Sequence, residues 1–107
     1  DLRFPVWLRN YHLKYDILMV VAEWPTNRQH IFETLLAARA IENQVYIAAV
    51  NCTSSDGTYN GYSMVIDPKG EIIAQAHSEG DEIIQARIES APQENYRKQF
   101  PVLRGLL

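Results

Sequence analysis

The sequence has little cysteine and no excess of positive charge. Its single cysteine, Cys52, cannot form an internal disulfide and is typical of a protein of the reducing cytoplasm. Ten basic residues against 13 acidic ones give a formal net charge of -3, and no basic cluster offers a surface for nucleic acid. No apolar run approaches the roughly 18 residues that span a membrane. We therefore expect a cytoplasmic protein with no nucleic-acid or membrane partner.

Patterns that bind cofactors are missing as well. The five glycines occur singly, so the sequence has no glycine-rich loop that could cradle a phosphate. His12, His30 and His77 show no metal-ligand spacing. We therefore predict neither a metal nor a cofactor. What is present, 47% hydrophobic and 21% charged residues over 107 positions, is typical of one globular domain with a modest core.

The clearest pattern is a strand, a helix and a second strand between residues 15 and 51. Residues 15–22 are almost continuously apolar, which predicts a strand covered on both faces, as in α/β folds. Pro25 ends that strand, and Thr26 or Asn27 is placed to cap a helix that runs to about Asn43. Residues 45–51 are apolar again. Such a unit places functional groups at the carboxyl end of its first strand.

The second half of the sequence predicts a meander. Strands are expected at 61–66, 71–76 and 82–88, with a turn at Asp67-Pro68-Lys69-Gly70 between the first two. Ser90 is placed to cap a last short helix, with Pro92 in its first turn. A flavodoxin-like domain would continue to alternate strands with helices. We therefore favour a β-α-β unit followed by a meander, preceded by a short helix after Pro5.

Both ends of the sequence indicate that it belongs to a longer domain. It opens on DLRFP, without a polar lead-in or a first strand, and it closes on the largely apolar residues 100–107. An apolar tail of that kind has to pack against something. We therefore expect the chain to be one part of a larger unit.

Five short motifs occur in order along the chain: DLRFP at 1–5, AEWP at 22–25, ARAIENQ at 38–44, GYS at 61–63 and IDPKG at 66–70. In this order they resemble the C-terminal half of the carbon–nitrogen hydrolase (nitrilase) superfamily, and most of all its omega-amidase branch. The resemblance implies a four-layer α-β-β-α sandwich of α/β class, of which residues 1–107 form the C-terminal half. It also implies a homo-oligomer, at least a dimer, with contacts through Trp7 and the helix at 28–43.

The same resemblance implies a hydrolase acting on a small amide. Omega-amidases release ammonia from the terminal amide of α-keto acids such as 2-oxoglutaramate, through a thioester on a catalytic cysteine. A glutamate base helps to form the thiolate, and a lysine stabilises the oxyanion. The cysteine is expected two residues before Asp1 and its partners further upstream, so the chain alone is expected to be inactive. A non-catalytic assembly or small-molecule-binding domain of the same fold is the alternative.

Three residues are candidate substrate-binding groups. Arg3 can pair with a carboxylate of the substrate, or it can form a salt bridge that orders its loop. Trp24 ends the first strand and can form a wall of the pocket or pack in the core. Glu23 can be a polar group of the pocket or a solvated acid of the loop. We predict that Arg3, Glu23 and Trp24 bind substrate.

Two other groups of residues are given structural roles. Cys52 follows the second strand without a histidine at a catalytic spacing, so we interpret it as a small residue at the base of a loop. Arg39, Glu42 and Asn43 lie at i, i+3 and i+4 on one helix face, which predicts an ion-pair and hydrogen-bond cluster.

Replacing Cys52 by serine tests the first of these interpretations. In the complete protein, Cys52→Ser is expected to leave amidase activity within about threefold, an effect below about 0.7 kcal/mol at about 1.4 kcal/mol per tenfold. Steady-state assays of ammonia release, run beside the wild type, measure it. A thousandfold loss would instead make Cys52 part of the chemistry.

Overall fold

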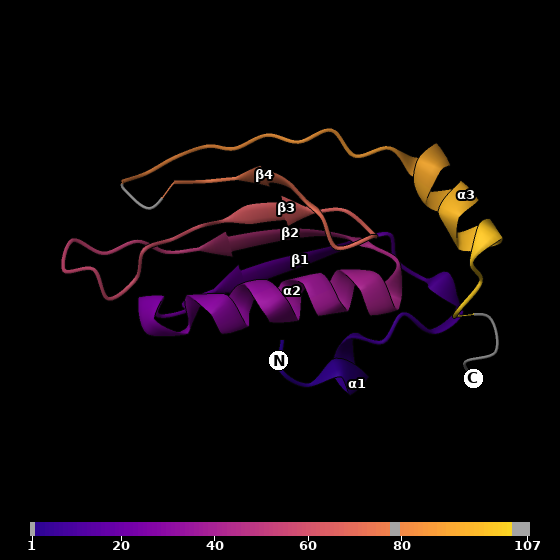
Figure 1. The fold of residues 1–107 in the computed structure, drawn as a ribbon, viewed down its shortest axis with the longest axis horizontal. Coiled ribbons are helices and arrows are strands. Elements are labelled where there is room, and N and C mark those ends of the chain that lie inside the picture. Colours follow the sequence, from indigo (N-terminus) through magenta and orange to yellow (C-terminus); the bar gives the residue numbers. More distant parts are fainter. Residues whose placement is uncertain (1, 78–79, 104–107) are drawn as a thin grey trace.

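One four-stranded sheet organises the part of the chain that the computed structural model describes, residues 2–77 and 80–103. The strands lie in the order β1-β2-β3-β4, with β1 and β2 parallel and the other neighbours antiparallel (Figure 1). The elements in chain order are α1 (Pro5–Leu8), η1 (Tyr11–Leu13), β1 (Ile17–Ala22), η2 (Thr26–Arg28), α2 (Gln29–Asn43), β2 (Tyr46–Asn51), β3 (Met64–Ile66), β4 (Ile72–Gln75) and α3 (Ser90–Gln99). The predicted β-α-β unit and the first hairpin of the meander are confirmed.

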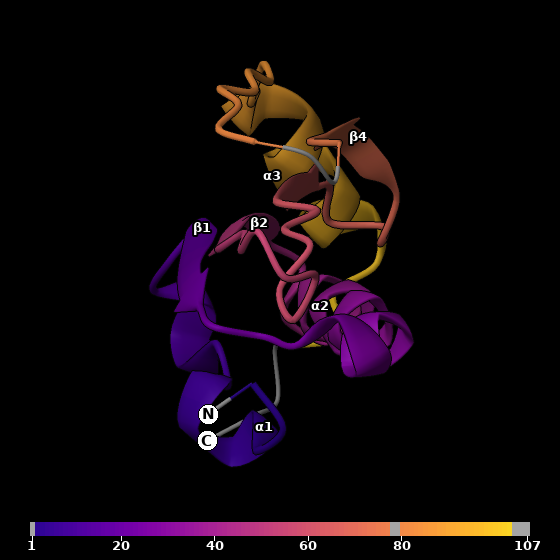
Figure 2. The same ribbon diagram turned by 90° about the vertical axis from the view of Figure 1, so that its left-hand side faces the viewer.

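Helix α2 connects β1 to β2 and covers one face of the sheet. Figure 2 shows α1 and α2 on the same side of the strands. The parallel pairing runs in register from Ile17 opposite Tyr46 to Ala22 opposite Asn51, so the carboxyl ends of the two strands lie side by side. A parallel pair needs a crossover of this kind, because its second strand must start at the same end as the first.

The core lies between α2 and the sheet. The helix contributes Phe32, Leu36 and Ala40, which recur every four residues and therefore share one face. The sheet side is formed by Ile47, Ala49, Met64 and Ile66, all of them buried. Leu2 belongs to the same buried cluster, and Leu8 and Trp24 pack against it.

Strand β1 is covered on only one face, contrary to the expectation from its apolar sequence. Met19 is 79% exposed and Val21 is 87% exposed, whereas Leu18 and Val20 pack against the core. The reason is that Leu18 and Val20 lie on the face that packs against the core cluster, and no described element covers the opposite face. Val50 of β2 extends this exposed apolar face.

Three local predictions are wrong. Neither Thr26 nor Asn27 caps α2, which begins at Gln29 after a 3-10 turn, and the Thr26 hydroxyl instead donates to the Gly57 carbonyl at 2.8 Å. Ser90 is the first residue of α3, and no side chain caps that helix. Residues 82–88 are extended but form no strand, and they run past β4 to α3 (Figure 1). An alternating apolar pattern alone does not supply the backbone partners that a strand requires.

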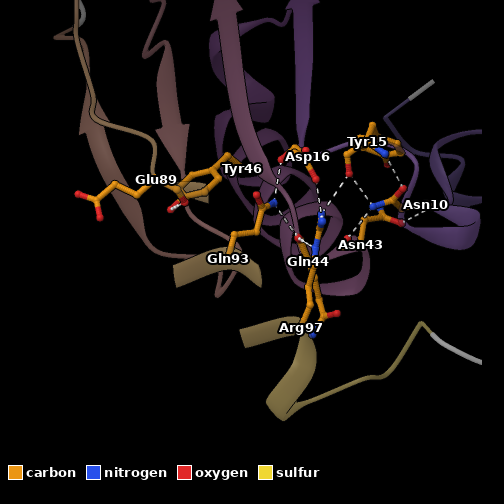
Figure 3. Close-up of polar contacts among 9 residues, drawn as sticks. All are labelled: Asn10, Tyr15, Asp16, Asn43, Gln44, Tyr46, Glu89, Gln93 and Arg97. Atoms are coloured by element: carbon orange, nitrogen blue, oxygen red, sulfur yellow. Dashed lines mark hydrogen bonds and ion pairs between the residues drawn. The ribbon is translucent and has the colours of Figure 1, made fainter. Parts of the chain in front are cut away.

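Polar side chains close the amino ends of β1 and β2 (Figure 3). Gln44, in the left-handed conformation with φ of 52°, ends α2 and turns the chain into β2. Its carbonyl accepts hydrogen bonds from Gln93 Nε2 and Arg97 Nε of α3, both at 3.1 Å. Arg97 also pairs with Asp16 at 2.7 Å. These contacts attach α3 to the sheet through polar groups rather than through an apolar face.

Asn10 joins the start of β1 to the end of α2. Its Oδ1 accepts from the Tyr15 N–H at 3.1 Å, and its Nδ2 donates to the Tyr15 carbonyl at 2.9 Å and to the Asn43 carbonyl at 3.3 Å. The side chain is completely buried, so these bonds replace its contacts with water.

The predicted cluster on α2 is confirmed. Arg39 Nη1 lies 3.2 Å from Glu42 Oε2, and Asn43 Nδ2 donates to the Arg39 carbonyl at 3.0 Å. Arg39 Nε also donates to the Leu2 carbonyl at 2.8 Å. The cluster therefore fastens the segment before α1 to the helix.

Two substitutions on α2 measure the strength of this core. Leu36 is fully buried, so Leu36→Ala should lower the free energy of unfolding by about 2–5 kcal/mol through lost burial and a cavity. Ile41→Ala, at a half-exposed site of the same helix, should cost about 1 kcal/mol or less. Denaturant unfolding of both variants provides the comparison, and equal losses would contradict this position of the core.

Candidate functional site

The candidate site lies where β1 and β2 reach their carboxyl ends. Ala22 pairs with Asn51 there, and the chain leaves the sheet in the turn at 23–26 and in the loop at 52–60. A cavity of about 380 Å³ opens beside β1, lined by Leu2, Leu8, Leu18, Met19, Val20, Val21, Ala22, Glu23 and Trp24. Two of the three predicted site residues, Glu23 and Trp24, line it.

Trp24 is held between the core and the cavity. Its ring stacks on Phe32 with centroids 5.3 Å apart, and its indole Nε1 donates to the Arg28 carbonyl at 2.7 Å. The ring therefore rests on the core with one part and lines the cavity with another. The two alternatives considered for Trp24, wall and core, are both present in its geometry.

Arg3 lies over the Trp24 ring. Its guanidinium carbon is 5.3 Å from the ring centroid, which is a cation–π contact. Arg3 is exposed and forms no ion pair within the described residues. The contact brings the third predicted residue to the other two, although Arg3 itself does not line the cavity.

Glu23 faces both solvent and the loop at 52–60. The residue is exposed, and its charge raises the pKa of the Tyr59 phenol, because a tyrosinate beside a carboxylate is repelled. Glu23 therefore lies at the mouth of the cavity, next to the loop that follows β2.

Asn51 belongs to the site but was not among the predicted residues. Its Oδ1 accepts from the Trp24 N–H at 2.8 Å, and its Nδ2 donates to the Trp24 carbonyl at 3.0 Å and to the Gly61 carbonyl at 3.0 Å. The only sequence signal is a polar residue at the end of an apolar strand. That signal does not reveal which backbone groups the amide binds.

The loop at 52–60 packs against the turn at 23–26. The Thr26 N–H donates to the Thr58 carbonyl at 2.8 Å. Inside the loop, Asp56 accepts hydrogen bonds from the Ser54 hydroxyl at 2.7 Å and from the Thr58 N–H at 3.0 Å. These bonds favour the carboxylate and lower the pKa of Asp56 to about 2.

Cys52 lies away from this cavity. It is partly buried and lines a separate cavity of about 350 Å³ between the ends of β2 and β4. The side chains that line the first cavity offer an indole, a carboxylate and apolar surface, but no thiol, hydroxyl or amine. Within the described residues, no group of three His, Cys, Asp or Glu side chains could hold a metal, and no helix is long and apolar enough to cross a membrane.

The fold and the site together define an α/β protein whose candidate site residues gather at the carboxyl ends of parallel strands, the usual position of binding sites in this class. The carbon–nitrogen hydrolase family model matches residues 1–98. The chain therefore belongs to the carbon–nitrogen hydrolase family, of the nitrilase superfamily.

Individual relatives are omega-amidases. The chain is 48% identical over 104 residues to omega-amidase YafV of Escherichia coli K12, which covers 94% of this chain and 40% of that protein. It is 41% identical over 105 residues to 2-oxoglutaramate amidase of Bacillus subtilis, covering 95% of this chain and 40% of that protein.

Solved structures show the same fold. XC1258 of Xanthomonas campestris, a CN-hydrolase superfamily protein, has a TM-score of 0.87 at 34% identity over 98% of this chain and 43% of its own. Nit3 of Saccharomyces cerevisiae has a TM-score of 0.84 at 28% identity over 95% of this chain and 39% of its own. The chain thus spans about two fifths of the length of these relatives.

The loop at 52–60 should keep its structure well into the acid range. A carboxyl whose pKa falls from 3.8 to about 2 on folding stabilises the fold fully above pH 3.8, and this contribution is lost as the pH falls through about 2. In NMR titrations of the complete protein, the Thr58 amide shift should change with a midpoint near 2. Asp56→Asn, which keeps an acceptor oxygen, should remove that transition. A midpoint near 4 would contradict the hydrogen-bond pattern.

Proposed function

We propose that the chain forms the substrate-binding part of an amidase that hydrolyses the terminal amide of an α-keto acid. The observation that carries the proposal is the 48% identity to omega-amidase YafV over 94% of the chain. The 41% identity to 2-oxoglutaramate amidase supports the same substrate class. Such a substrate is small, with a carboxylate at one end and the amide at the other.

The site has groups that suit the two ends of this substrate. The guanidinium of Arg3 is a donor for the substrate carboxylate, and its contact with the Trp24 ring holds it at the rim. The indole provides a wall for the carbon chain. Glu23 provides a polar group at the mouth. We assign substrate binding to these three residues.

We further propose that residues 1–107 are the C-terminal half of a single four-layer domain. Two observations support this: the chain spans about two fifths of its relatives, and the sheet face of Met19, Val21 and Val50 is exposed and apolar. The other half would supply a catalytic cysteine, glutamate and lysine. The thiolate would attack the amide carbon, ammonia would leave, and water would hydrolyse the thioester to the free acid.

A homo-oligomer, at least a dimer, belongs to the same proposal. Trp7 of α1 is 81% exposed, and Phe4 and Val6 beside it are exposed as well. Contiguous exposed apolar side chains of this kind are typical of subunit contacts.

The single cysteine of this chain supports a reducing compartment, the cytoplasm.

The complete protein should release ammonia from 2-oxoglutaramate. A coupled assay for ammonia, with the 2-oxoglutarate product measured separately, provides the test. Binding of the substrate without turnover would overturn the amidase proposal and favour a small-molecule-binding domain of the same fold.

Arg3→Leu should weaken recognition of the substrate carboxylate. Loss of a hydrogen bond to a charged group costs about 1.5–3 kcal/mol, which raises KM about 10- to 100-fold at 1.4 kcal/mol per tenfold. An amide of similar length without the carboxylate should be hydrolysed as by the wild type. Arg87→Leu, which removes an exposed cation that does not line the cavity, is the matched control. If Arg3→Leu slows both substrates equally and lowers Tm, then Arg3 orders its loop instead.

A further inference from the structure

The side-chain amide of Asn51 holds Trp24 by both of its backbone groups. Oδ1 accepts from the Trp24 N–H at 2.8 Å, and Nδ2 donates to the Trp24 carbonyl at 3.0 Å. Asn51 is the last residue of β2, and Trp24 follows the last residue pair of the parallel ladder. The amide thus continues the pairing of β1 with β2 past the last ladder pair, where the chain leaves β1 for the turn at 23–26.

The orientation of the Trp24 ring depends on this step. With its backbone held from β2, Trp24 places its indole against Phe32 and its Nε1 on the Arg28 carbonyl. Arg3 then rests on the same ring. Asn51 does not line the cavity and is 7% exposed, so it acts on the wall only through Trp24.

The same amide also holds the segment that enters β3. The second bond from Nδ2 goes to the Gly61 carbonyl at 3.0 Å, and the Asn51 N–H donates to the Ser63 hydroxyl at 2.9 Å. Between these two residues lies Tyr62, whose φ of 55° is in the left-handed region that bulky side chains rarely adopt. A strained residue persists only where its surroundings hold it, and here the contacts of Asn51 with Gly61 and Ser63 flank Tyr62 on both sides.

We propose that Asn51 is a positioning residue of the active site, which sets the Trp24 wall and, through it, Arg3. The inference rests on the proposed amidase function and deepens it, because it names the group that fixes the substrate-binding wall. All three hydrogen bonds of the Asn51 side chain go to backbone groups, so its substitution removes no side chain of the wall and acts only through the position of Trp24.

Asn10 offers a matched control, because it binds the backbone before β1 as Asn51 binds the backbone after β1. Its amide binds both backbone groups of Tyr15 and a further carbonyl, that of Asn43, in the same pattern as Asn51 (Figure 3). Both asparagines are buried. An aspartate at either position would replace a donor by an oxygen that faces two carbonyl oxygens, so the structural damage should be similar. Asn51 binds directly to Trp24, a residue of the cavity wall, whereas neither Tyr15 nor Asn43 lines the cavity.

The experiment compares Asn51→Asp with Asn10→Asp in the complete protein, by Tm and by kcat and KM for 2-oxoglutaramate. Both variants should lose Tm to a similar extent. Asn51→Asp should raise KM at least tenfold with kcat within threefold, whereas Asn10→Asp should leave both constants within twofold. Equal changes of KM in the two variants would overturn the inference, as would an unchanged KM in Asn51→Asp.

Milder variants decide the question if an aspartate variant does not fold. Asn51→Ser replaces the amide by a hydroxyl that is too short to reach both Trp24 groups, and it should raise KM at least threefold, whereas the KM of Asn10→Ser should stay that of the wild type. A KM for Asn51→Ser within twofold of the wild type would refute the positioning role. A wild-type protein that hydrolyses no amide would instead overturn the proposed function, and this inference with it.

Discussion

The burial of α2 against β2 and β3 is the constraint on which the rest of the structure depends. The helix can hide Phe32, Leu36 and Ala40 only by lying along the sheet. Lying there, it returns the chain to the end at which β1 began, so that β2 runs parallel to β1. The register that results places Ala22 opposite Asn51, and the turn and the loop of the candidate site therefore start at the same edge.

Buried asparagine side chains bind the backbone at both ends of the parallel pair β1–β2. At the amino edge, Asn10 binds the backbone of Tyr15, and Arg97 and Gln93 of α3 bind the Gln44 carbonyl. At the carboxyl edge, Asn51 binds the backbone of Trp24. Backbone groups at the end of a strand lose their ladder partners, and a buried amide can satisfy a donor and an acceptor together. The same kind of asparagine contact therefore stabilises the amino ends of the strands and holds a residue of the candidate site at their carboxyl ends.

The site combines a wall that the core supports with charges that solvent can reach. Trp24 rests on Phe32, while Arg3 and Glu23 remain exposed around it. An aromatic ring that packs on the core and a cation on its face are the groups to which we assign substrate binding. This division agrees with membership of the carbon–nitrogen hydrolase family for a chain that covers about two fifths of the amidases it matches.

The sequence by itself determined the order of the three α-helices and of strands β1 to β4, the end of α2 at Asn43, the turn at Asp67-Pro68-Lys69-Gly70 and the family. These depend on local periodicity, on proline and glycine, and on short motifs. It also pointed to Glu23 and Trp24, since both follow a strand. Only the tertiary structure decided that residues 82–88 find no strand partner and that one face of β1 is exposed.

The role of Asn51 was also decided only by the tertiary structure, because its amide binds Trp24, 27 positions away in the sequence. Hydrogen-bond partners and covered faces are set by which distant segments pack together, and no local pattern contains that information.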